Sequence, residues 1–169
     1  MTVFTEGDLQ ISFPSSATTR KFDDGSTHGL SRCIKAVDFI VELTDRFLFI
    51  EIKDPEDPKA NPKDRQTFIP EFLVTGISED LKYKYRDSFL YEWASEKADK
   101  PIYYLVLIAI SGLTEADLIA RADDLKRKIP LHGPSGGVWK RQIVGDVIVF
   151  NLSVWNKHLK DFPIQRSTP

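Results

Sequence analysis

VDFIVELTDRFLFIEIKD, residues 37–54, contains two apolar runs rich in β-branched and aromatic residues, a composition that predicts two neighbouring β-strands. Only two residues separate the runs, a connection short enough for a β-hairpin. Three charged groups, Asp38, Glu51 and Lys53, interrupt these apolar runs. Burying such groups costs free energy unless they are paired or coordinate an ion. Their positions therefore need a physical explanation.

The expected hairpin register brings the three charges together. A turn at Thr44-Asp45 places Asp38 directly opposite Glu51, and Lys53 points to the same face because side chains alternate along a strand. Like charges directly opposite each other destabilise a sheet by up to about 1 kcal/mol. A hard divalent cation such as Mg²⁺, which binds carboxylates together with waters and phosphate, removes this conflict. The hairpin therefore predicts a metal site with an ammonium group beside it.

The same residues resemble the motif of the PD-(D/E)xK nucleases, the restriction-endonuclease-like superfamily. Asp38 is followed, after twelve residues, by Glu51-Ile52-Lys53, although Val37 stands where the motif has proline. The resemblance implies that Asp38, Glu51 and the main-chain carbonyl of Ile52 hold Mg²⁺, or Mn²⁺ in its place. It implies that Lys53 assists the attacking water. It also implies a three-layer fold in which a central mixed β-sheet is flanked by helices.

The acid-x-Lys triplet also occurs at 57–59, 80–82 and 124–126, so the triplet alone has little specificity. Only at Glu51 does the acid lie in an apolar strand, opposite an Asp on a preceding apolar strand. The strand context therefore carries the resemblance.

The family also suggests further site residues. An acid usually comes from a first helix, and Glu6 is the upstream candidate if a short N-terminal helix forms, with Asp23 or Asp24 as substitutes. A basic residue or Gln often comes from a helix after the motif strand. The candidates for this substrate-binding position are Gln66, Lys82, Lys84 and Arg86. Lys82 and Arg86 share a helix face, whereas Lys84 lies nearer the packed side.

The rest of the pattern predicts one α/β domain spanning residues 1–169. Strands are expected at 9–13, 35–43, 46–53, 102–110 and 147–155, and helices at 64–74, 78–97 and 114–129. Leu81, Tyr85, Phe89 and Trp93 lie four residues apart and should form the apolar face of the second helix. The last strand, helix and strand predict a parallel crossover unit.

Composition limits the class of protein. The net charge of −2 argues against nonspecific coating of nucleic acid. Basic residues nevertheless outnumber acids in 121–141, which indicates either a basic rim around the acidic site or a solvated helix end and loop. The longest apolar run is too short to span a bilayer. The N-terminus lacks a secretion signal, and the single Cys33 cannot form an internal disulfide. We expect a cytoplasmic protein without a membrane segment.

These observations predict a Mg²⁺-dependent endonuclease or exonuclease that hydrolyses phosphodiester bonds, in DNA rather than RNA. Recognition of a specific site would require a homodimer or a partner protein. Two alternatives stay open: a nuclease-like fold that has lost catalysis and serves as a binding or assembly module, and an unrelated α/β interaction protein whose hairpin charges form surface salt bridges.

Overall fold

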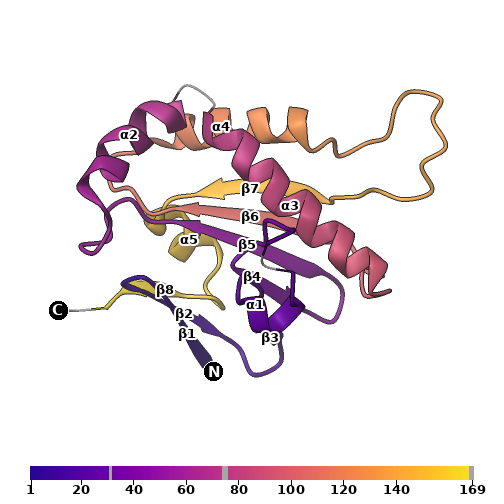
Figure 1. The fold of residues 1–169 in the computed structure, drawn as a ribbon, viewed down its shortest axis with the longest axis horizontal. Coiled ribbons are helices and arrows are strands. Elements are labelled where there is room, and N and C mark those ends of the chain that lie inside the picture. Colours follow the sequence, from indigo (N-terminus) through magenta and orange to yellow (C-terminus); the bar gives the residue numbers. More distant parts are fainter. Residues whose placement is uncertain (31, 74–75, 168–169) are drawn as a thin grey trace.

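The fold is built on two β-sheets (Figure 1). The computed structural model describes residues 1–30, 32–73 and 76–167. A mixed five-stranded sheet has the order β3-β4-β5-β6-β7, in which β5 pairs antiparallel with β4 and parallel with β6. A smaller antiparallel sheet has the order β1-β2-β8. The strands are β1 (Thr2–Glu6), β2 (Leu9–Phe13), β3 (Thr18–Lys21), β4 (Phe39–Glu42), β5 (Phe47–Lys53), β6 (Ile102–Ile108), β7 (Asp146–Phe150) and β8 (Ile164–Arg166).

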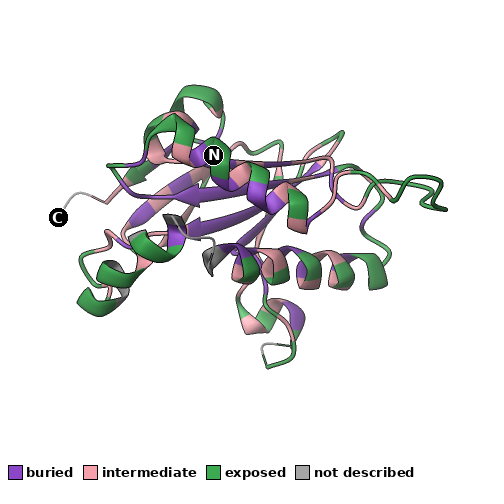
Figure 2. Cartoon of the chain, turned by 90° about the horizontal axis from the view of Figure 1, so that it is seen from above, coloured by how far each residue is buried: buried purple, intermediate pink, exposed green. Residues whose placement is uncertain are grey.

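Three layers result. One face of the five-stranded sheet is covered by α2 (Pro62–Leu73), α3 (Gly76–Ala94) and α4 (Glu115–Lys128). The small sheet and α5 (Leu152–His158) cover the other face, while the short α1 (Gly25–His28) follows β3. Two apolar clusters fill the spaces between layers, and the central strands are buried while the helices expose their outer sides (Figure 2). The expected α/β class is correct, but one flanking layer is mainly a sheet.

The predicted hairpin is present with the predicted register. Phe39 pairs with Ile50 and Glu42 with Phe47, and the Leu43 N–H donates to the Arg46 carbonyl over 2.9 Å, which closes the two-residue turn. β5 is buried along its length except at its last residue because it lies between β4 and β6. The hairpin therefore holds its charged residues inside the layered structure.

Several expected elements differ in extent. Residues 147–155 are not one strand, because Asn151 accepts a hydrogen bond from the Val154 N–H and so caps α5. The helix expected to begin at Ser78, α3, begins two residues earlier, at Gly76. The Ser78 hydroxyl is buried and accepts a hydrogen bond from Arg121. Trp93 is 58% exposed, so the apolar face of α3 ends one turn earlier than expected.

The terminal segments differ most. The first residues form strand β1 and not the short helix considered for Glu6, and β8 was not anticipated. The predicted parallel unit, β6-α4-β7, is confirmed. Within the described ranges, no helix is long and apolar enough to cross a membrane.

Candidate active site

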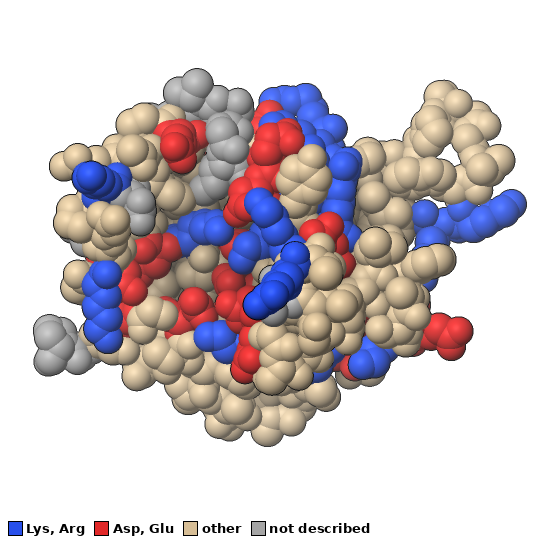
Figure 3. All heavy atoms as spheres, in the orientation of Figure 1, with Lys and Arg blue, Asp and Glu red and all other residues tan. Residues whose placement is uncertain are grey.

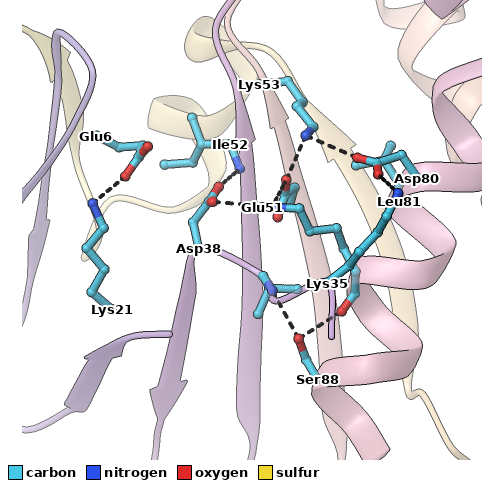
Figure 4. A network of polar contacts seen from close by, with 12 residues as sticks. Glu6, Lys21, Lys35, Asp38, Glu51, Ile52, Lys53, Asp80, Leu81 and Ser88 are labelled. Carbon is cyan, nitrogen blue, oxygen red and sulfur yellow. Dashed lines mark hydrogen bonds and ion pairs between the residues drawn. The ribbon is translucent and has the colours of Figure 1, made fainter. Parts of the chain in front are cut away.

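Asp38, Glu51 and Lys53 meet at the open end of the hairpin, on the face that α3 covers (Figure 4). Asp38 directly precedes β4, and Glu51 and Lys53 lie on β5. Asp38 is 5% exposed and Glu51 is fully buried. The Lys53 ammonium lies 3.0 Å from Glu51 Oε1. The structure therefore brings together the three residues on which the sequence prediction depends.

A main-chain group orients the first carboxylate. Asp38 Oδ2 accepts a hydrogen bond of 2.5 Å from the Ile52 N–H. The N–H and C=O of one strand residue point in the same direction, so the Ile52 carbonyl also faces this side of β5. The main-chain groups of the next residue, Lys53, point to the opposite edge of β5. The Lys53 carbonyl accepts a hydrogen bond from the N–H of Ala109, the residue that follows β6.

Lys84 of α3 is the fourth member of the cluster. Its ammonium lies 3.0 Å from Glu51 Oε1 and 3.8 Å from Asp38 Oδ1. The position of α3 is fixed by Ser88, whose hydroxyl donates to the Lys84 carbonyl and accepts from the Val37 N–H. One positive charge thus lies between two buried carboxylates.

Glu51 has two ammonium groups beside one of its oxygens and no donor beside the other. Lys53 Nζ and Lys84 Nζ each lie 3.0 Å from Oε1, whereas Oε2 is buried without a hydrogen-bond partner among the described residues. Buried polar atoms are nearly always hydrogen-bonded, so the unpartnered Oε2 is unusual. Oε2 is therefore the Glu51 atom with unused coordinating capacity.

The electrostatics of the cluster are set by burial and by these pairs. Burial raises the pKa of the Asp38 carboxyl well above its usual range, and the nearby Glu51 charge raises it further, against the opposing effect of Lys84. Burial lowers the pKa of Lys53, but the charges of Glu51 and Asp80 outweigh burial and raise it overall. Lys53 is therefore an ammonium at neutral pH.

Asp80 was not anticipated from sequence. It lies one helical turn before Lys84 and pairs with Lys53 over 3.3 Å and with Lys35 over 2.7 Å. Burial raises the pKa of Asp80, but its bond to Lys35 and the charge of Lys53 lower it overall. The four-residue spacing from Lys84 is the one sequence signal that could have placed Asp80 on the same face of α3.

A second group of acids adjoins Asp38. Single carboxylate oxygens of Glu6, Asp23 and Asp38 lie within 4.8 Å of one another. Glu6 comes from the end of β1, where it pairs with Lys21 over 2.7 Å, so a strand delivers the acid that was expected on a helix. Asp23 Oδ1 is buried without a hydrogen-bond partner among the described residues. Burial, and to a smaller extent the charge of Glu6, raises the pKa of Asp23. Asp24 instead caps α1.

The other proposed substrate-binding residues lie away from the cluster. Lys82 pairs with Glu79, and Arg86 donates to the Lys128 carbonyl over 3.0 Å. Gln66 is exposed on α2. Of the four candidates, which the sequence could not rank, Lys84 alone contacts the acids.

The expected basic rim is largely paired within the protein. Arg121 is buried over the Phe72 ring, and Lys126 pairs with Asp146 over 2.8 Å. Lys128 pairs with Glu79 over 2.8 Å. On the face of the molecule drawn in Figure 3, acidic and basic side chains are interleaved. The positive charge that remains closest to the acids comes from Lys53 and Lys84.

Comparison with known proteins adds no relative: no family model, no curated protein and no solved structure matches this chain.

Proposed function

We propose that this chain is a metal-dependent nuclease that hydrolyses phosphodiester bonds, with DNA as the preferred substrate, on a fold of the restriction-endonuclease-like type. The observation that carries the proposal is the fully buried Glu51 carboxylate, which faces Asp38 in the hairpin register and whose Oε2 has no hydrogen-bond partner among the described residues. A buried carboxylate oxygen without a donor has coordination capacity for a cation.

The donor set fits a hard cation. Asp38, Glu51 and the Ile52 carbonyl offer oxygen ligands, the type that Mg²⁺ and Mn²⁺ prefer. Glu6 lies within 4.8 Å of Asp38 in a group with Asp23 that does not include Glu51, so Glu6 could serve only a cation on that side of Asp38. When bound, the metal would polarise the phosphate and lower the pKa of a water.

The lysines have separate tasks in this proposal. Lys53 is held as an ammonium by Glu51 and Asp80, so it can donate a hydrogen bond to a phosphate oxygen or hold the attacking water, but it is not a general base. Lys84 occupies the space between the two carboxylates, so a cation shared by Asp38 and Glu51 would compete with its ammonium.

That competition favours a second candidate function. Two lysines already balance the two buried acids, Asp38 and Glu51, without a metal. A nuclease-like fold whose ammonium groups replace the cation would serve as a binding or assembly module.

The first experiment compares cleavage by the wild type with that by Glu51→Gln and Glu42→Gln. Glu42 is the matched control because it lies on the same hairpin but is exposed and pairs with Lys100. The substrates are linear and closed circular DNA and RNA, each with Mg²⁺, Mn²⁺ or EDTA. We expect metal-dependent cleavage that Glu51→Gln abolishes and Glu42→Gln retains, and cleavage of circles identifies an endonuclease. Cleavage that persists in Glu51→Gln would refute the site.

The second experiment measures metal binding without activity. A ligand that binds the folded state raises thermal stability. Mg²⁺ should therefore raise the Tm of the wild type and should raise it more in Lys84→Met, which lacks the competing ammonium. Lys82→Met, which removes an ammonium of the same helix that pairs with Glu79 and not with Asp38 or Glu51, is the control and should behave as wild type. No metal-induced shift in either the wild type or Lys84→Met would favour the inactive module.

A further inference from the structure

A hollow on the surface is walled by the two elements that also build the proposed active site. It has a volume of ≈ 470 Å³ and is lined by residues 32–35, which lead into Asp38, and by Tyr83 and Asp87 of α3. The Lys35 N–H donates to Asp87 Oδ2 over 2.8 Å. This bond uses the Asp87 carboxylate to hold the segment against α3, so the hollow has a fixed position relative to the buried acids.

A row of ion pairs connects the hollow with those acids (Figure 4). A single carboxylate, that of Asp80, pairs with Lys53 over 3.3 Å and with Lys35 over 2.7 Å. Side-chain exposure rises along this row from 1% at Glu51 to 56% at Lys35. Because only one carboxylate separates the two ammonium groups, a strand whose phosphate contacts Lys53 reaches the hollow about one or two nucleotides further along.

The hollow presents an aromatic ring together with cations. Tyr83 is 45% exposed, and the ammonium groups of Lys82 and Lys35 lie 4.5 and 6.0 Å from its ring centroid. Arg32 is exposed, and its guanidinium makes no ion pair with the described residues. An exposed ring among cations is the combination with which proteins bind single nucleic acid strands, because bases stack on the ring and phosphates bind the cations.

We propose that this hollow binds an unpaired nucleotide of a DNA strand whose scissile phosphate lies at Lys53. One base stacks on Tyr83, and Arg32 and Lys35 contact the neighbouring phosphates. This inference rests on the proposed nuclease function and narrows its substrate to DNA with unpaired bases. In a duplex the face of each base is covered by its stacked neighbours, so it is not open to a protein ring.

The single cysteine of the chain is a direct probe of the hollow. Cys33 is exposed and lines the hollow, so a bound strand should protect its thiol from alkylation by iodoacetamide. The rate is measured in EDTA with a single DNA strand, with the same strand in a duplex and with a single RNA strand of the same sequence. We expect the single DNA strand to reach half-protection at a concentration about tenfold lower than the duplex does.

Variants of Tyr83 test the stacking. Tyr83→Ala should raise the DNA concentration for half-protection about tenfold, the order of effect that loss of one stacked base produces, whereas Tyr83→Phe should bind as the wild type does. Trp93→Ala is the matched control, because Trp93 is an exposed aromatic residue of the same helix that does not line the hollow. With Mg²⁺ present, Tyr83→Ala should raise the KM for single-stranded DNA and leave kcat nearly unchanged. Circular dichroism checks that each variant is folded.

The binding and cleavage measurements separate failure of this inference from failure of the nuclease proposal. Protection of Cys33 by the single DNA strand without metal-dependent cleavage of any substrate would support the strand-binding hollow and refute the nuclease. Metal-dependent cleavage without protection of Cys33 would overturn the hollow as a binding site. Half-protection at the same concentration for duplex and single strand, or for Tyr83→Ala and wild type, would also overturn it. Tighter binding of the RNA strand than of the DNA strand would overturn the choice of DNA.

Discussion

Asp38 and Glu51 are acids at positions where a hairpin ordinarily places apolar side chains. The protein stabilises the two acids by different means. Asp38 accepts a hydrogen bond from the Ile52 N–H and lies near Lys84. Glu51 is stabilised by the charges of Lys53 and Lys84. Such arrangements can cost stability relative to an apolar pair of the same volume, because desolvation of the charges offsets their attraction. A site retained at that cost is a reasonable place to look for function.

Asp38→Asn should stabilise the folded protein at neutral pH. Asn retains an oxygen that can accept from the Ile52 N–H but removes the buried charge. Because burial and Glu51 raise the pKa of Asp38 in the folded state, the folded protein holds this proton more tightly than the unfolded chain does. Wild-type stability therefore falls as the pH rises from about 4 through the raised pKa, a loss that the variant lacks.

Urea unfolding at a series of pH values measures this difference, which should vanish in acid. Asp45→Asn is the control on the same hairpin, since its bond to Arg46 lowers the Asp45 pKa and the exposed carboxylate should gain nothing from neutralisation. A difference between wild type and Asp38→Asn that grows on acidification would show that the pKa shift has the opposite sign.

At the scale of elements, local patterns were predictable and distant pairings were not. The hairpin register followed from a two-residue turn and alternating side chains, both of which are local. The helix expected at 114–129 from its spacing of apolar residues is observed as α4, which Thr114 caps. In contrast, β8 pairs with β2 across nearly the whole chain, and no local signal marks so distant a contact.

The errors at the site have the same origin. Lys84 reaches Glu51, and Asp80 reaches Lys53, only because α3 packs across the hairpin, a tertiary contact that sequence spacing does not specify. The misassigned strand at 147–155 is a case in which a cap, Asn151, lies inside a continuous apolar run. The sequence therefore predicted the motif residues, but it could not rank the helix residues that complete the cluster.

The capping box of α4 makes a prediction at this scale. The Thr114 hydroxyl accepts from the Asp117 N–H, and the Asp117 carboxylate accepts from the Thr114 N–H. Thr114→Ala should lower the free energy of unfolding by about 1 kcal/mol, whereas Thr114→Ser, which retains the hydroxyl, should lose much less. The midpoint of urea unfolding measures both. An equal loss in both variants would mean that the methyl group, not the cap, matters.

At the scale of the whole molecule, the C-terminal strand holds the two sheets together. Arg166 of β8 bonds to Asp8 over 2.7 Å and to Asp54 over 2.8 and 2.9 Å, and its Nη2 donates to the Ala109 carbonyl over 3.2 Å. Asp8 precedes β2, Asp54 follows β5 and Ala109 follows β6, so one guanidinium joins both sheets. Burial raises the pKa of Asp54, against the opposing effect of Arg166.

Arg166→Met should destabilise the protein by about 1 to 3 kcal/mol, because it leaves Asp8 and Asp54 as partly buried like charges without a cation. Arg166→Lys should recover only part of the loss, since an ammonium cannot bond to the two Asp54 oxygens as a planar guanidinium does. Arg46→Met removes an exposed pair with Asp45 and serves as the control, with an expected change within about 0.5 kcal/mol.

The stability loss of Arg166→Met should also depend on pH. Without the guanidinium, Asp8 and Asp54 hold protons more tightly in the folded state, so the stability loss should narrow from pH 7 toward pH 4. Urea unfolding at both pH values measures this change, and a deficit that stays constant would mean that Arg166 acts through packing rather than charge.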